Sequence, residues 1–120
     1  MLAIEPNAAQ HRNAALALVV VAASTAAMVA VQWVASLDGP LLAPLTAAYL
    51  VFNLGYIFGA IRARLQSKGS RLGHVAVVLN VLGMLLGDFT VIWTVLSLFA
   101  VVAALIASAL LFADARRETS

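Results

Sequence analysis

The chain has 120 residues, of which 64% are hydrophobic and only 10% charged, with a net charge of +2. A soluble domain is about 45–50% apolar and about 25% charged, and a chain this short has too little interior to hide the excess. The composition therefore excludes a soluble globular domain and a disordered chain. It predicts an integral membrane protein. The absence of cysteine excludes disulfides and thiolate metal sites.

Charged residues divide the chain into four uncharged stretches. Their lengths are 25 residues between Arg12 and Asp38, 23 between Asp38 and Arg62, 16 between Arg71 and Asp88, and 25 between Asp88 and Asp114. A transmembrane helix needs about 20 mainly apolar residues. We therefore expect an all-α protein, a single domain over 1–120, built as a four-helix bundle with spans at about 14–36, 41–61, 72–87 and 89–113.

The basic residues predict the orientation of this bundle. With four spans, all seven fall on one side: Arg12, Arg62, Arg64, Lys68, Arg71, Arg116 and Arg117. The opposite side carries Asp38 and Asp88, with Trp33 and Trp93 nearby as an aromatic belt. The positive-inside rule then places both termini in the cytoplasm. The expected location is the plasma (bacterial inner) membrane.

The third stretch is short, and this leaves two alternatives open. Either the third helix begins before residue 72 and Arg71 reaches back to the interface, or Asp88 lies below the outer surface of the membrane. A buried carboxylate would indicate proton or cation handling. The sequence Gly87-Asp88 favours a helix end followed by an N-capping aspartate.

Small residues recur at helical spacing in every predicted span. Lipid provides no hydrophobic drive for helices to associate, so small residues that permit close packing hold such bundles together. The candidate packing residues are Ala22, Ala26, Ala30, Gly55, Gly59, Gly83, Gly87, Ala100 and Ala104. Whether each one faces its own bundle or another subunit is open at this stage.

Two amides fall at matching depth in neighbouring spans. Asn53 lies nine residues before Arg62, and Asn80 lies nine after Arg71, so both sit about 13 Å from the basic boundary. Because the two spans are consecutive and antiparallel, we expect their side chains to form a hydrogen bond near mid-membrane. A polar site for a solute is the alternative interpretation.

Two further polar residues are candidates at the ends of the spans. His74 lies one turn inside Arg71, and a single histidine at this position is better explained as an interfacial residue than as a haem ligand. Gln32 lies at the outer depth of Thr90 and Thr94, with which it is expected to form hydrogen bonds. No metal site or cofactor is expected.

The sequence offers little for catalysis. Acid–base or nucleophilic chemistry needs paired groups within hydrogen-bond reach, and Asp38 and Asp88 fall in separate short turns without a histidine on that side. No basic patch interleaved with aromatics predicts a nucleic-acid partner. We therefore expect a non-catalytic accessory subunit that packs against a larger membrane protein. The alternative is a small homo-oligomeric transporter or channel with a path near Asn53, Asn80 and Asp88.

Overall fold

The computed structural model describes residues 8–35, 42–65, 67–86 and 90–119, and these are almost entirely helical, with no strand among them. Helix α1 covers Ala8–Ala30 and continues directly into a π-helical turn, η1, at Val31–Ala35. The other helices are α2 at Leu42–Arg62, α3 at Lys68–Leu85 and α4 at Thr90–Thr119. The all-α prediction is therefore confirmed.

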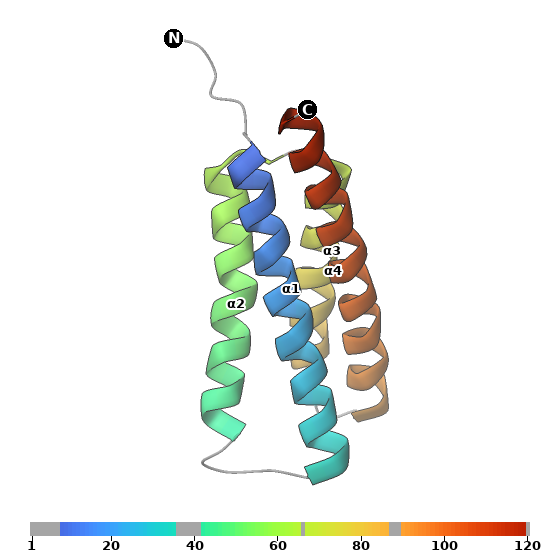
Figure 1. Cartoon of the computed structure of the whole chain (residues 1–120). Helices are drawn as coiled ribbons and strands as arrows, with labels where there is room; N and C mark the ends of the chain where they lie inside the picture. Colours follow the sequence, from blue (N-terminus) through green and yellow to red (C-terminus); the bar gives the residue numbers. More distant parts are fainter. Residues whose placement is uncertain (1–7, 36–41, 66, 87–89, 120) are drawn as a thin grey trace.

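The four helices run alternately down and up (Figure 1). The start of α1, the turn between α2 and α3 and the end of α4 lie together at one end of the bundle. We call this the basic end. Helix α4 packs extensively against both α1 and α3, whereas α2 packs against α1 and only slightly against α3. Specific polar contacts therefore matter most for α2, whose apolar packing is the least extensive.

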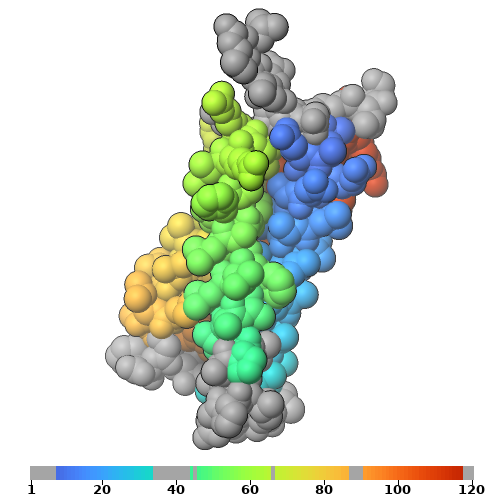
Figure 2. Space-filling model, turned by 90° about the vertical axis from the view of Figure 1, so that its left-hand side faces the viewer, coloured from blue at the N-terminus to red at the C-terminus, as the bar shows by residue number. Residues whose placement is uncertain are grey.

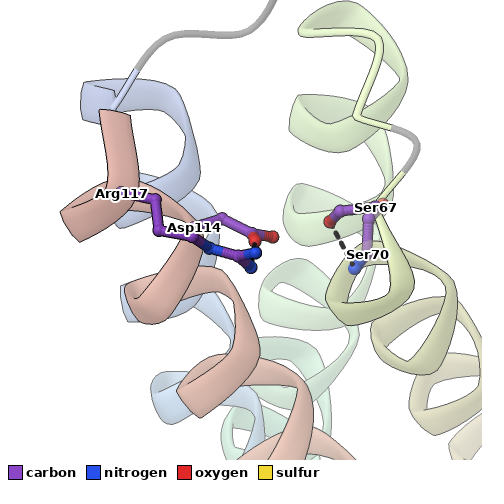
Figure 3. Close-up of polar contacts among 4 residues, drawn as sticks. All are labelled: Ser67, Ser70, Asp114 and Arg117. Atoms are coloured by element: carbon purple, nitrogen blue, oxygen red, sulfur yellow. Dashed lines mark hydrogen bonds and ion pairs between the residues drawn. The ribbon is translucent and has the colours of Figure 1, made fainter. Parts of the chain in front are cut away.

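Three helix boundaries at the basic end differ from the predicted spans, and one of them is the end of α4, which runs to Thr119 rather than ending at 113. Helix α1 begins at Ala8, so that Arg12 lies inside it. Helix α3 begins at Lys68, where the Ser67 side chain accepts a hydrogen bond from the Ser70 backbone N–H at 3.2 Å (Figure 3). The helix therefore begins before residue 72, as the first of the two alternatives requires, and Arg71 lies within it. Asp88, on which the second alternative depends, lies outside the described residues.

The α2–α3 turn is set by the backbone at Arg64. This residue has φ 58, in the left-handed region, and the N–H of Leu65 donates to the carbonyl of Ala60 at 3.0 Å. A left-handed residue followed by this backward bond is the Schellman ending of a helix. Leu65 is buried by the same turn, which fixes the α2–α3 connection against the bundle.

The side chains are distributed with polar groups inside and large apolar groups outside. Alanines, a few larger apolar residues and several polar side chains form the interior. The outer surface carries exposed large hydrophobic residues on all four helices, among them Leu16 on α1, Phe58 on α2, Leu85 on α3 and Phe99 on α4. Among the described residues, two segments are long and apolar enough to cross a membrane: Ala8–Trp33 and Val91–Arg117.

The structure divides the predicted packing residues into two groups. Ala22, Gly83, Ala100 and Ala104 are buried within the bundle. Ala26, Ala30, Gly55 and Gly59 are exposed on its outside, and Gly87 lies outside the described residues.

The closest helix contacts in α3 involve two glycines that the sequence analysis did not select. A Cβ on Gly69 would lie 3.0 Å from side-chain atoms of Leu110 and Leu111, and one on Gly73 would lie 2.2 Å from the Tyr56 hydroxyl oxygen. Glycine at 69 and 73 therefore lets α3 approach α4 and α2 closely.

Candidate functional site: a buried polar layer

Polar side chains from all four helices are buried near the middle of the bundle. Thr25, Tyr49, Asn53, Asn80 and Ser97 are each at most 2% exposed. We call these five residues the polar layer.

Ser97 belongs to this layer through the register of α1 against α4. The Ser108 hydroxyl donates to the Ala15 carbonyl at 2.9 Å and so aligns the two helices. Thr25 lies ten residues beyond Ala15, and Ser97 lies eleven before Ser108. On antiparallel helices the two positions are about 15 Å and about 16.5 Å from that bond. Thr25 and Ser97 therefore lie at nearly the same level.

The two asparagines meet as their depths predict. Asn80 donates from Nδ2 to Oδ1 of Asn53 at 2.8 Å, and Asn53 donates from its own Nδ2 to the Tyr49 carbonyl at 2.8 Å. The second bond fixes which end of each amide is oxygen: a backbone carbonyl only accepts, so Asn53 must turn its nitrogen toward Tyr49 and its oxygen toward Asn80. The predicted interhelical hydrogen bond is confirmed.

Thr25 extends the layer to α1. Its hydroxyl is 2.8 Å from the Val21 carbonyl and 3.4 Å from Oδ1 of Asn80. Thr25 is not among the candidates predicted from the sequence. A hydroxyl in an apolar helix usually bonds to the carbonyl one turn back, as this one does. Its position facing Asn80 depends on how α1 is rotated in the bundle.

Two hydroxyls of the layer have no hydrogen-bond partner among the described residues: those of Tyr49 and Ser97. The Tyr49 hydroxyl lies beside Thr25 without forming a bond of ordinary geometry. Ser97 faces α3 at Gly83, 3.8 Å from the point where a Cβ would stand. Buried polar atoms without partners are uncommon in folded proteins. These hydroxyls distinguish the layer from a fully satisfied interhelical contact.

A second polar cluster lies at the basic end. The Ser70 carbonyl accepts from the Tyr56 hydroxyl at 3.0 Å and lies 2.6 Å from Nδ1 of His74, which must be the protonated nitrogen if it donates there. The His74 and Tyr56 rings also meet edge to face, with centroids 5.7 Å apart. His74 thus takes part in the packing of α3 against α2.

The remaining predicted site residues are not drawn together. Gln32 is exposed, and the hydrogen bond from this region to α4 is made instead by Trp33, whose Nε1 donates to the Thr94 hydroxyl at 2.6 Å. Asp88 lies outside the described residues. Within the parts of the chain that the structure describes, no group of three or more histidine or acidic side chains is arranged to hold a metal ion.

The layer thus consists of neutral amides and hydroxyls, which suit binding of helices, water or a small neutral molecule rather than acid–base chemistry. Near the end of α4, the exposed Arg117 side chain pairs with the partly buried Asp114 (Figure 3). Comparison with protein-family models, curated proteins and solved structures gives no match.

Proposed function

We propose that the chain is a small integral membrane protein that crosses the plasma (bacterial inner) membrane four times. The distribution of its side chains supports this: large hydrophobic residues are exposed on every helix, while the polar layer is buried. Water would penalise that arrangement and lipid would favour it. Helix α2 carries a single charged residue, Arg62, at its end, and α3 spans about 27 Å over its 18 residues.

The orientation follows from the basic end. All seven lysine and arginine residues are exposed and fall on the segments that meet there. Under the positive-inside rule this end lies in the cytoplasm, together with both chain termini. The exposed hydrophobic surface then faces the bilayer.

In this membrane the chain acts as a non-catalytic accessory subunit of a larger membrane protein. The observation that carries this proposal is that the two buried amides bind each other. The hydrogen bond between Asn53 and Asn80 gives these side chains a structural role in holding the bundle together. The outer face of α2 is the best candidate contact surface. Figure 2 shows α2 (green) along the face turned to the viewer, and a Cβ on Gly55 or Gly59 would meet no atom within 4 Å.

Purification of a tagged chain from its native membranes in mild detergent tests this proposal. We expect a larger membrane protein in stoichiometric amount. Replacing Gly55 and Gly59 with leucine should release that protein, because bulky side chains prevent close helix approach. As a matched control, Val78→Leu and Val102→Leu change exposed positions on α3 and α4 and should retain it. Retention by the glycine variant would exclude the α2 face, and recovery of a homodimer alone would contradict the accessory role.

The second candidate is a homo-oligomeric transporter or channel with a path near Asn53, Asn80 and Asp88. The two unpartnered hydroxyls of Tyr49 and Ser97 favour it, because costly polar groups mark intramembrane pathways. This function predicts solute or ion flux in vesicles that contain the purified homo-oligomer. Flux should fall when Asn53 and Asn80 are both replaced by leucine.

A further inference from the structure

The polar layer contains one acceptor with only a long, weak hydrogen bond, Asn80 Oδ1, as well as two hydroxyls without a partner among the described residues. The Thr25 hydroxyl has one hydrogen and faces two acceptors, the Val21 carbonyl at 2.8 Å and Asn80 Oδ1 at 3.4 Å. Hydroxyl hydrogen bonds are commonly 2.5–3.0 Å long, so the hydrogen goes to Val21. Asn80 Oδ1 and Thr25 Oγ1 then present lone pairs to each other.

The amide cannot be turned over to relieve this conflict. The Tyr49 carbonyl fixes Asn53, and Asn53 in turn requires the nitrogen of Asn80. Oδ1 of Asn80 must therefore face Thr25, where the described residues provide no closer donor. The one unused hydrogen beside Thr25 belongs to the hydroxyl of Tyr49.

We propose that a buried water molecule binds between Tyr49, Thr25 and Asn80. It accepts the Tyr49 hydroxyl hydrogen and donates one hydrogen to Asn80 Oδ1 and the other to Thr25 Oγ1. A bound cation would satisfy the oxygens but leave the Tyr49 hydrogen unused, and an anion would face two oxygen acceptors. Water has both donors and acceptors, and buried waters typically make about three hydrogen bonds.

This water would connect three helices at one point. Thr25 is on α1, Tyr49 on α2 and Asn80 on α3. Because α2 packs only slightly against α3, a bridging water adds to the Asn53–Asn80 bond in holding α2 in place. The site depends only on the interior of the bundle and would exist with either proposed function.

Whether Tyr49→Phe lowers or raises the stability of the protein tests the water site. If water binds the Tyr49 hydroxyl, Tyr49→Phe should reduce the folding equilibrium constant by about three- to tenfold in reversible unfolding in detergent micelles. If the hydroxyl is unpartnered, Tyr49→Phe should leave that constant unchanged or raise it, which would overturn the proposal. Tyr56→Phe is the positive control, because Tyr56 has a direct partner in the Ser70 carbonyl.

A direct measurement separates bridging water from a direct Tyr49–Thr25 bond. In NMR spectra of the protein in deuterated micelles, the side-chain amide protons of Asn80 should show a nuclear Overhauser effect to long-lived water. The effect should disappear in Tyr49→Phe and persist in Ser97→Ala, which removes the other unpartnered hydroxyl. Loss of stability in Tyr49→Phe without any water signal in the unaltered protein would indicate a direct bond and overturn the proposal.

Discussion

Asn80 donates a 2.8 Å hydrogen bond to Asn53 and thereby joins α3 to α2, two consecutive helices that pack only slightly against each other. Both side chains are almost completely buried. In apolar surroundings each amide has few substitutes for this partner. The bond therefore holds α2 in a defined rotation against the rest of the bundle.

Replacement of Asn53 by leucine should destabilise the protein by about 1 kcal/mol, because it leaves the Asn80 amide without its acceptor. The measurement is reversible unfolding in detergent. The double variant Asn53→Leu with Asn80→Leu is the control. It should recover part of the loss, since it removes both partners. Strictly additive losses would show that the two amides are not coupled.

Gly73→Ala should destabilise the bundle by about 1–3 kcal/mol, because the new methyl group would stand 2.2 Å from the Tyr56 hydroxyl oxygen and force α2 and α3 apart. Gly55→Ala is the matched control on α2, where a Cβ meets nothing within 4 Å. It should be neutral or slightly stabilising in the isolated chain, since alanine favours helix over glycine by about 1 kcal/mol. Equal losses in the two variants would contradict the packing of α3 against Tyr56.

Arg64→Gly should stabilise the α2–α3 turn by about 0.5–1 kcal/mol. Arg64 has φ 58, which costs an L-residue free energy that glycine does not incur. The midpoint of thermal unfolding in detergent shows whether the variant is more or less stable than the unaltered protein. Arg64→Ala removes the same charge but keeps the unfavourable left-handed backbone conformation of a residue with a side chain. A gain in stability shared by both variants would therefore arise from the loss of charge.

The proposed four membrane crossings predict which sites are accessible from each side. Single cysteines at Ser67 and Ser120 should react with an impermeant thiol reagent only from the cytoplasm, and one at Gly39 only from outside. The chain has no native cysteine to interfere. Labelling of positions 39 and 67 from the same side would contradict the four-span topology.

Asp88→Asn should leave folding and cellular activity nearly intact if the residue is an interfacial cap, because asparagine is also a good N-cap. A transporter that uses this carboxylate would lose activity despite normal expression. Activity and expression must therefore be measured in the same cells, with Asp38→Asn as the control in the other predicted outer turn.

Several features of this protein could be predicted from the order of its residues. Long apolar stretches between charges indicated four helices, and equal distances of Asn53 and Asn80 from the flanking arginines indicated their contact. Both features depend on position along a helix axis. Since each residue advances an α-helix by a constant rise, that position can be counted in the sequence.

Rotation about the axis was decided only by the tertiary structure. Apolar residues occur on all sides of these helices, so no polar face marks which side turns inward. The sequence thus does not show that Gly73 lies inside the bundle while Gly55 and Gly59, which are also glycines, lie outside. The same holds for the burial of Thr25. Side-chain contacts between helices select these rotations, and those contacts exist only once the four helices have packed together.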